Sequence, residues 1–539
     1  MNKNIVMLSV INSSMRRMYE DYGTSSITAT MRSLGFNVLL IADHENALDI
    51  QEIVDFEPYI IGLSMYKISK ESVYNVCRRL KEAIPNVIIT VGGIYPSYNH
   101  VLVLEECAHI DVAIRGEGEA VFADMAQKLY EQKDLSTVGN ITYRLNGEIH
   151  INDNALLIKD LDSLPIESRD ILVRNKLRVA QISTSRGCTG HCTFCAKQLF
   201  WTNWRGRSAG HVVHEMEQIY LRHGVDAFYF IDSSLEDPDE GGTRLWELLN
   251  KLIERDLPIY FFANFRADFV RNATPEMMNA LVRAGLCGAC IGIESFNDDD
   301  LKLYGKMATA DDNRRIIEMF NQYDIYIQPG FININPYSSL DSLRNNITHL
   351  RQYQMLCNRS MFLNQLAVFK DTAIHRKIER DGLMKQIDFD EYGYDFVDSH
   401  VKKAVQFLRS YIADIPDNYN QYLNVISYYT NDFMTLFHYF KRKYHDLKSL
   451  KSAIEIFNIQ IHKYINIVND LIAKWLLELL NAVEKNKNTK ELKALSDTLL
   501  LNPCLQETVE GIYKVKNNLF LESARAGTTC LDDLTHVIF

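Results

Sequence analysis

The pattern of apolar and polar positions divides the chain into regions of different periodicity. In the first 135 residues, short β-branched runs that are apolar at nearly every position alternate with longer segments of helical spacing. The predicted strands are residues 5–11, 37–42, 59–65, 87–93 and 111–116. Strands that are apolar on both faces and separated by helices indicate a parallel sheet covered on each side. Residues 1–135 are therefore predicted to form a doubly wound, Rossmann-like domain.

A connecting region, residues 136–177, follows this domain. The segment NITYRLNGEIHIND alternates in the manner of a β-hairpin with Asn-Gly at its turn. The segment DSLPIESRDIL contains a proline and scattered charges, which indicates a linker. We expect this region to join two larger domains.

A second alternation of strands and helices occupies residues 178–385. The predicted strands are residues 179–185, 227–232, 259–265, 288–294, 325–333 and 362–369. Six βα units are too few for an eight-unit barrel and fit a partial, open (β/α)6 barrel. Reactive groups of such barrels sit at the carboxyl ends of strands. The sequence RGCTGHCTFC follows the first of these strands at that location.

From residue 386 to 539 the pattern is helical throughout. In the segment 461–483, apolar residues recur with three-and-four spacing, which predicts an amphipathic helix in an all-helical C-terminal domain. This domain is expected to cap the mouth of the barrel and shape a substrate pocket. Its aromatic stretch SYYTNDFMTLFHYF (427–440) is expected to pack in a core.

Composition and charge exclude several classes of protein. Among 539 residues, 47% are hydrophobic and 24% charged, as in ordinary globular domains. The net charge of −11 argues against a nucleic-acid surface, which needs clustered Lys and Arg. We find no signal peptide and no apolar stretch long enough for a membrane span, so we expect a cytoplasmic protein. In that reducing compartment, clustered cysteines indicate metal ligands or catalytic groups.

The cysteines at 188, 192 and 195 form the most specific motif of the chain. Chance alone would produce this spacing about 0.003 times in a chain with so few cysteines. Structural zinc needs four protein ligands, and a 4Fe–4S cluster is normally held by four thiolates. Three cysteines leave one iron open, where a substrate or cofactor can bind. His191 lies inside the tight loop and is poorly placed to be the fourth ligand.

A second pair, Cys287 and Cys290, carries little information. A C-x2-C spacing arises often by chance, and this pair lies in a predicted buried strand without a second pair nearby. We expect both side chains to pack in the core.

The motif C-x3-C-x-Phe-C, with Phe194 at its aromatic position, resembles the radical S-adenosylmethionine superfamily. In that family the open iron binds the amino and carboxylate groups of S-adenosylmethionine. An electron from the cluster then releases a 5′-deoxyadenosyl radical, which abstracts hydrogen from an unactivated carbon. The resemblance implies a 4Fe–4S cluster on Cys188, Cys192 and Cys195, with S-adenosylmethionine as cofactor. It also implies an electron donor such as flavodoxin or ferredoxin.

The resemblance assigns further residues along the barrel. Asp232 stands where the family places a polar group on the methionyl amine, and Arg266 follows the third strand. Glu294 and Ser295 stand near the ribose and carboxylate positions. The segments PGFININPYSS and FKDTAIH depart from the Gly-rich and Pro-Gly-Thr stretches that are usual after the fifth and sixth strands. Because of these departures, the contacts that the family makes with adenine are harder to assign to residues of this chain.

The N-terminal domain and the linker together resemble the cobalamin-binding subgroup of this superfamily. The segments GLSMYKIS, VGGIYPS and RGEGE stand where that subgroup lines its corrin pocket. The candidate positions are Ser64, Gly92, Gly93, Gly116 and Glu117. The segment INSSMRRMYEDYG after the first strand has no histidine to bind cobalt, and the Asp43-His44 pair is expected to be a loop pair. We therefore expect cobalamin without a protein histidine on cobalt.

The resemblance implies an α/β fold: a Rossmann-like cobalamin-binding domain, a partial (β/α)6 radical S-adenosylmethionine barrel and an all-helical C-terminal domain. The function it favours is a cobalamin-dependent C-methyltransferase acting on a small metabolite or peptide. A non-methylating ring contraction, cyclisation or rearrangement is the first alternative. A transfer RNA methylthiotransferase would need a second trio of cysteines near the N-terminus, which is missing. A metal-binding structural or interaction module is the non-enzymatic alternative, and it would need a fourth zinc ligand.

Overall fold

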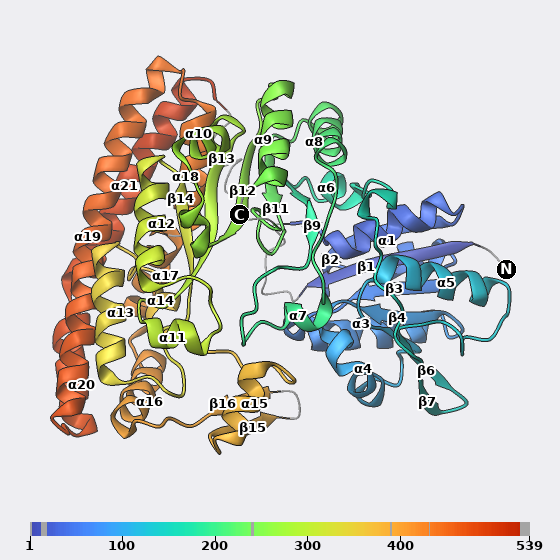
Figure 1. Ribbon diagram of the computed structural model, residues 1–539, viewed down its shortest axis with the longest axis horizontal. Coiled ribbons are helices and arrows are strands. Elements are labelled where there is room, and N and C mark those ends of the chain that lie inside the picture. Colours follow the sequence, from blue (N-terminus) through green and yellow to red (C-terminus); the bar gives the residue numbers. More distant parts are fainter. Residues whose placement is uncertain (1–2, 12–18, 239–241, 389–390, 431, 529–539) are drawn as a thin grey trace. The chain divides into compact units, whose positions relative to one another are not determined.

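The computed structural model describes residues 3–11, 19–238, 242–388, 391–430 and 432–528, in two compact units (Figure 1). The first unit comprises Met1–Gly187 and Phe200–Ile231, and the second comprises Cys188–Leu199 and Asp232–Phe539. The predicted barrel region contributes to both units. The domain boundaries given above follow sequence pattern rather than compactness, and they stay predictions.

The first unit contains a seven-stranded sheet with the order β2-β1-β3-β4-β5-β6-β7. Its strands are β1 (Asn4–Ile11), β2 (Asn37–His44), β3 (Ile60–Ser64), β4 (Ile88–Gly92), β5 (Val112–Ile114), β6 (Ile141–Leu145) and β7 (Glu148–Ile151). The first five are parallel, and they confirm the five strands predicted for residues 1–135.

Helices cover both faces of this sheet, as the apolar strands predicted. The helices are α1 (Tyr22–Ser33), α2 (Ile50–Asp55), α3 (Lys70–Ala83), α4 (Ile94–Glu106), α5 (Gly118–Tyr130) and α6 (Asp170–Arg174). One face packs its alternate side chains against α3 and α4 in a single buried cluster that includes Leu8, Leu63, Val76 and Leu104. On the other face α1 packs against α5.

The predicted hairpin forms, but it also extends the sheet. Asn146 and Gly147 both have positive φ angles, of 52° and 86°, which suits a tight two-residue turn. Strand β6 pairs antiparallel with β5, so β6 and β7 become the edge of the parallel sheet. The sequence pattern identified the strands but not this partner.

The barrel region supplies five of the six predicted strands among the described residues. In the first unit β8 (Val179–Ile182) pairs parallel with β11 (Ala227–Phe230). In the second unit β12 (Tyr260–Arg266), β13 (Leu286–Glu294) and β14 (Tyr326–Phe331) pair parallel in that order. The short strands β9 (Ser185–Arg186) and β10 (Arg205–Gly206) pair antiparallel. The helices of this region are α7 (Lys197–Phe200), α8 (Ala209–His223), α9 (Thr243–Arg255), α10 (Pro275–Arg283), α11 (Asp298–Leu303), α12 (Ala310–Gln322) and α13 (Leu340–Gln352).

The prediction of a sixth strand over 362–369 is wrong. Helix α14 (Arg359–Leu363) occupies its beginning, because the Asn358 side chain accepts a hydrogen bond from the Ser360 amide and starts a helix there. What remains of strand pairing is a single parallel bridge between Ile334 and Gln365. Helix α15 (Ala373–Arg380) and the hairpin of β15 (Met384–Asp388) and β16 (Glu391–Tyr394) follow.

The prediction of helices alone over residues 386–539 is wrong at its start, because β15 and β16 lie at 384–394, but from α16 onward the described part of this region is all-helical. It comprises α16 (Ser399–Ala413), α17 (Asp417–Thr430), α18 (Asp432–Lys443), α19 (Lys448–Glu484), α20 (Thr489–Leu500) and α21 (Pro503–Arg525). The predicted apolar stripe of α19 is buried, and Trp475 at its centre is 0% exposed. The aromatic residues Phe433, Phe437 and Phe440 of α18 are also buried, which confirms their packing role.

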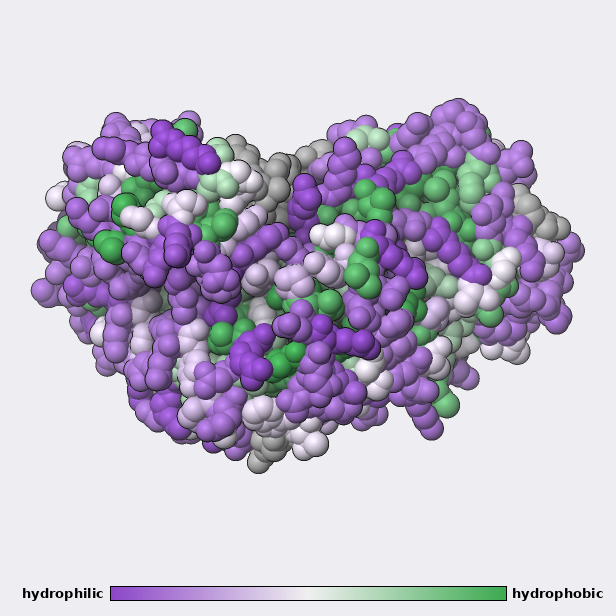
Figure 2. All heavy atoms as spheres, turned by 90° about the horizontal axis from the view of Figure 1, so that it is seen from above, coloured by the Kyte–Doolittle hydropathy of each residue, from purple (hydrophilic) through white to green (hydrophobic). Residues whose placement is uncertain are grey.

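Polar side chains dominate the face drawn in Figure 2, where apolar groups are scattered between them. Among the described residues, no helix is long and apolar enough to cross a membrane.

Candidate functional site

The three cysteines of the motif lie on one loop between β9 and α7. All three are free thiols with intermediate exposure. The loop begins at Gly187, whose φ of +89° places it in the left-handed region. A Cβ at this position would lie 2.5 Å from the Asn203 carbonyl oxygen, so only glycine fits here.

Two threonines within this loop anchor it to other segments of the second unit. The Thr189 amide and hydroxyl donate to the two carboxylate oxygens of Asp237, at 3.0 Å and 2.6 Å. The Thr193 amide donates to the Tyr304 carbonyl at 2.8 Å, and its hydroxyl donates to the Leu303 carbonyl at 2.8 Å. The thiols are therefore carried by a loop that is fixed at two points.

Phe194, the aromatic residue of the motif, packs against the second anchor. Its ring meets the Tyr304 ring edge-on, with centroids 5.7 Å apart. It joins an apolar cluster that includes Ile374 and Ile378. The structure thus gives Phe194 a packing role in the loop, and its predicted contact with a cofactor stays a prediction.

The thiols of this loop suit an iron–sulfur cluster. Burial raises the pKa of Cys188 to about 11 and also raises the pKa of Cys192, so both are protonated thiols without a metal. Bound iron would replace those protons, since thiolates are the ligand form. The Gly190 amide already donates to the Cys188 sulfur at 3.3 Å, the kind of hydrogen bond that tunes such clusters.

Among the described residues, no group of three or more His, Cys, Asp and Glu side chains is arranged to hold a single metal ion. The ligands of one ion must meet at one point. The thiolates of a 4Fe–4S cluster instead bind different irons of the cube. The three thiols of the loop fit that second requirement in their number and their placement on one segment.

Arg266 ends β12 and lies among carboxylates of its own chain. Its guanidinium contacts Asp237 and lies 3.2 Å from Asp268 through Nε, and it donates to the Thr189 hydroxyl at 2.9 Å. Burial lowers the pKa of Arg266, but the carboxylates of Glu236, Asp237 and Asp268 outweigh it and raise the pKa. The charged Arg266 therefore connects the cysteine loop, through Thr189, with the carboxylates of Asp237 and Asp268.

Glu294 ends β13 and Ser295 follows it, in an unusual local geometry. The ladder between β13 and β14 shifts register between Gly292 and Glu294, and Glu294 has a φ of +59°. Its carboxylate lies 3.4 Å from the Nζ of the buried Lys306. The Ser295 hydroxyl is buried and lies 2.7 Å from Asp300.

Asp232 is placed in the segment that follows β11, and it is 1% exposed. The Asn264 side chain on β12 donates to its backbone carbonyl at 2.7 Å. The segment that carries Asp232 is therefore hydrogen-bonded to the strand that carries Arg266, through Asn264 and Glu236.

Sequence reasoning missed three residues of this site, Asp237, Glu236 and Lys306. Lys306 follows Gly305, whose positive φ of 65° lets the chain pass close to the His191 carbonyl. The Gly-Lys pair was a visible signal for this approach. The proximity of Asp237 and Glu236 to the loop depends on tertiary structure, and no sequence signal marked it.

The predicted corrin positions gather at the carboxyl edge of the first unit's sheet. Strand order reverses between β1 and β3, and ligands bind beyond such a switch point in open α/β sheets. Ser64 and Gly92 end β3 and β4 and are paired neighbours across the ladder. Gly93 has a φ of +105°, and a Cβ there would lie 3.2 Å from the Met65 carbonyl oxygen.

The same edge presents apolar side chains to its surroundings. Tyr66 and Ile68 after β3 are 47% and 67% exposed, and Ile94 after β4 is 40% exposed. Gly116 after β5 has a φ of +72°, and its amide donates to the Ser97 hydroxyl at 2.9 Å. Glycines that let a ligand approach the backbone, beside exposed apolar groups, fit a large flat macrocycle.

Glu117 is already engaged by protein groups. Its carboxylate accepts hydrogen bonds from Arg205 at 2.8 Å and from the Trp201 indole at 3.1 Å. Arg186 lies 3.2 Å away. Any contact with a corrin would add to these bonds.

The segment 12–18, in which a cobalt-binding histidine would be sought, lies outside the described residues. Asp43 and His44 lie within β2, where His44 pairs in register with Ile11 at the end of β1, so the expectation of a loop pair is wrong. The expectation of cobalamin without a protein histidine on cobalt stays a prediction.

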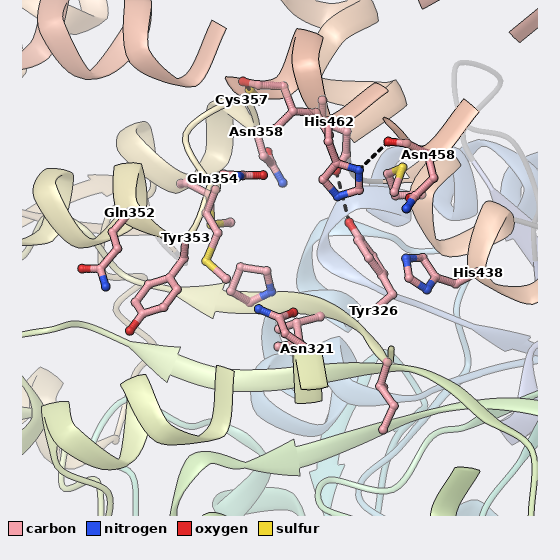
Figure 3. A pocket seen from close by; sticks show the side chains of 18 of the residues that line it. Asn321, Tyr326, Gln352, Tyr353, Gln354, Cys357, Asn358, His438, Asn458 and His462 are labelled. Atoms are coloured by element: carbon pink, nitrogen blue, oxygen red, sulfur yellow. Dashed lines mark hydrogen bonds between the residues drawn. The ribbon is translucent and has the colours of Figure 1, made fainter. Parts of the chain in front are cut away.

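A cavity of about 390 Å³ lies in the second unit beside β14. Figure 3 shows the side chains of Asn321, Asn358 and His462 around it, and α17, α18 and α19 form part of its wall. The His462 Nδ1 lies 2.8 Å from the Asn458 carbonyl, which can only accept, so Nδ1 donates this hydrogen bond. None of the predicted site residues lines this cavity.

Comparison with known proteins finds matches to the N-terminal domain and to the barrel region. The B12 binding domain family matches residues 8–126, and the Radical SAM superfamily matches residues 182–336. An uncharacterised methyltransferase of Pyrococcus horikoshii is 26% identical over 291 residues, which are 53% of this chain and 62% of the relative. The anaerobic magnesium-protoporphyrin IX monomethyl ester cyclase of Synechocystis sp. is 28% identical over 315 residues, 56% of this chain and 62% of the relative.

Among solved structures, the cobalamin-dependent S-adenosylmethionine radical enzyme OxsB with aqua-cobalamin bound has a similar fold. Its TM-score is 0.71 at 21% identity, and the match covers 98% of this chain and 80% of that one. The chain spans about six tenths of the length of the two curated relatives. The predicted fold class and the cofactor set of cobalamin, S-adenosylmethionine and a 4Fe–4S cluster are confirmed. The chain belongs to the cobalamin-binding radical S-adenosylmethionine enzymes.

Proposed function

We propose that the protein is a C-methyltransferase that acts on an unactivated carbon of a small metabolite or peptide. The observation that carries this proposal is the presence in one chain of a three-thiol loop and a sheet edge lined with glycines. The matched methyltransferase of Pyrococcus horikoshii supports it.

Cys188, Cys192 and Cys195 would hold three irons of the cluster. With S-adenosylmethionine bound, the cluster supplies one-electron cleavage and the hydrogen abstraction that follows. The two threonine anchors hold the thiols on a fixed loop, so little reorganisation is needed when the cluster binds.

The remaining assignments follow the resemblance. Asp232, Arg266, Glu294 and Ser295 are proposed to face S-adenosylmethionine, with Phe194 packing behind the loop. The positions proposed to line the corrin are Ser64, Gly92, Gly93, Gly116 and Glu117. The exposed apolar groups at that sheet edge support this assignment, because a corrin would cover them.

Partners and location are proposed on the same basis. The cluster needs an electron donor, such as flavodoxin or ferredoxin. The acidic net charge of −11 supports a substrate other than nucleic acid. Cluster chemistry of this kind requires a reducing compartment, which supports the cytoplasm.

The test is transfer of a labelled methyl group. Reconstituted protein, reductant, cobalamin and methyl-labelled S-adenosylmethionine are incubated with candidate substrates, and the products are analysed by mass. Label in a carbon-bound methyl group of the product is expected, and replacement of all three loop cysteines by alanine should abolish it. Label that stays in the donor with the true substrate would contradict methyl transfer.

A non-methylating cyclisation or rearrangement is the second candidate, and the similarity to an anaerobic cyclase favours it. The two candidates differ in their by-products. Methyl transfer from S-adenosylmethionine releases S-adenosylhomocysteine, whereas a rearrangement releases 5′-deoxyadenosine alone. Quantifying both in the same reaction separates them.

A further inference from the structure

The cysteine loop is held differently at its two ends. At Thr193, both partners are neutral backbone carbonyls, those of Tyr304 and Leu303. At Thr189, next to Cys188, the partner is the carboxylate of Asp237, which accepts from both the amide and the hydroxyl. A charged group thus contacts the loop directly beside its first thiol.

Asp237 is fully shielded from solvent and is paired with one cation. Its side chain is 0% exposed, and it contacts the guanidinium of Arg266, which is 18% exposed. Arg266 also donates to the Thr189 hydroxyl, so Asp237, Arg266 and Thr189 form a closed triangle of hydrogen bonds. Charges in such a buried position are screened little by solvent.

The same residues come close to the Cys188 sulfur. A Cβ on Gly190 would lie 3.4 Å from that sulfur and 3.5 Å from Arg266 Cδ, which shows how near the two groups are. Asp237 contacts Arg266 and accepts from Thr189, the residue next to Cys188, so a fixed carboxylate lies close to the first ligand.

We propose that Asp237 is a positioning residue that fixes the Cys188 end of the loop and lowers the reduction potential of the bound cluster. This rests on the proposed function, because it requires a cluster on the three thiols. Reduction adds an electron to the cluster, and a nearby buried negative charge makes that addition less favourable. Removing the charge while Arg266 remains should therefore make the cluster easier to reduce.

If Asp237 only held the loop in place, a different result would be expected. Loss of an anchor would loosen the loop and speed iron release, but it would not dictate the direction of a change in potential. Asp237→Asn changes both, because it removes the negative charge and turns one of the two accepting oxygens into an NH2 group, which cannot accept a hydrogen bond. Asp268→Asn is the matched control, since Asp268 accepts from the same guanidinium through Nε, whereas Asp237 also accepts from Thr189 of the cysteine loop.

The experiment compares the two variants with the wild-type chain, each reconstituted with iron and sulfide under anaerobic conditions. The reduction potential is measured by redox titration followed by electron paramagnetic resonance. Iron release to a chelator is timed, and exchange of the Thr189 amide is followed in the protein without a cluster.

For Asp237→Asn we expect a more positive potential and iron release faster by roughly tenfold or more, as for other residues that orient metal ligands. Its Thr189 amide should also exchange faster. Asp268→Asn should release iron at the wild-type rate and shift the potential less. An Asp237→Asn protein with the wild-type potential and iron-release rate overturns the proposal.

A second substitution keeps the test decisive if Asp237→Asn does not fold. Thr189→Val removes both hydrogen bonds of the hydroxyl, the one donated to Asp237 and the one accepted from Arg266, but keeps the amide bond, and it should speed iron release. Thr189→Ser should keep the wild-type rate. Equal rates for both would overturn the positioning role. A wild-type chain that assembles no 4Fe–4S cluster refutes the proposed function instead, and amide exchange at Thr189 still tests the anchor.

Discussion

Glu236 allows the energetic consequence of a buried carboxyl to be tested directly. It is 6% exposed, and its Oε1 accepts hydrogen bonds from the Ser234 hydroxyl and the Arg266 amide. Its Oε2 is buried without a hydrogen-bond partner among the described residues. Burial raises the pKa of Glu236 from 4.5 to about 7, although Arg266 opposes the rise.

The sign of the pH effect follows from proton binding. Below pH 4.5, both the folded and the unfolded chain hold this proton, and the group costs no stability. Between there and about pH 7, the unfolded chain releases the proton while the folded chain keeps it, so stability falls as pH rises. The full loss is about 3 kcal/mol, at about 1.4 kcal/mol for each unit of pKa.

Glu236→Gln should therefore change stability in opposite directions at low and high pH. The amide keeps the shape of the protonated acid and still accepts both hydrogen bonds, but its buried nitrogen lacks a partner, at a cost of about 1 kcal/mol. We expect the variant to be about 2 kcal/mol more stable than the wild type near pH 8. Near pH 5 we expect it to be equal or slightly less stable.

Thermal unfolding of the full chain without cofactors, followed at several pH values between about 5 and 8, measures this difference. Glu119→Gln is the control. Burial raises the pKa of Glu119, but Arg186 and Ser26 lower it by more than burial raises it, so the net shift of the pKa is downward. That variant should be less stable than the wild type throughout the range. A Glu236→Gln protein that is destabilised equally near pH 5 and pH 8 would refute the reasoning.

Three further predictions concern stability and cofactor retention. Gly93→Ala should cost about 1–3 kcal/mol and reduce cobalamin retention in a dialysis assay, whereas Gly35→Ala, also at positive φ but with open space around it, should keep retention unchanged. Arg169→Met leaves the buried carboxylate of Glu20 without its cation and removes one of the two arginines that contact the buried Glu215, so it should cost about 3–5 kcal/mol in chemical unfolding. Arg174→Met removes an ion pair whose arginine is 43% exposed and should cost at most about 1 kcal/mol in the same assay. Trp475→Ala should lower the thermal midpoint, at a cost of about 3–5 kcal/mol, because the indole is fully buried.

The parallel strands could be predicted because their signal is local. A run that is apolar on both faces fits few structures other than a covered strand, and β1 to β5 carry such runs. The failed sixth strand shows the limit of this signal. The segment FLNQLAVF is apolar enough for a strand, but the side chain of Asn358 starts a helix just before it.

The residues of the candidate site also differ in whether a local sequence signal marks them. Spacing alone indicated Cys188, Cys192 and Cys195 as candidate ligands, because thiols on one loop are neighbours in sequence as well as in space. Asp237 and Lys306 come from segments far from the loop in sequence. The approach of Asp237 depends on strand order, which a single sequence does not encode as a pattern, whereas Gly305 before Lys306 was a local signal of a close turn.

Three of the residues that the resemblance assigns to cofactors already form hydrogen bonds with other segments of the protein. Arg266, Glu117 and Ser295 each bond a protein group from another segment, so each already stabilises the arrangement of the chain. Substituting any of them would therefore disturb the fold locally before it removed a ligand contact. Loss of activity in such a variant cannot by itself identify a cofactor contact. A glycine such as Gly93 has no side chain to bond elsewhere, and a change there acts through the backbone and the space above it. The glycine positions are therefore the sharper probes of the sheet edge that is proposed to hold the corrin.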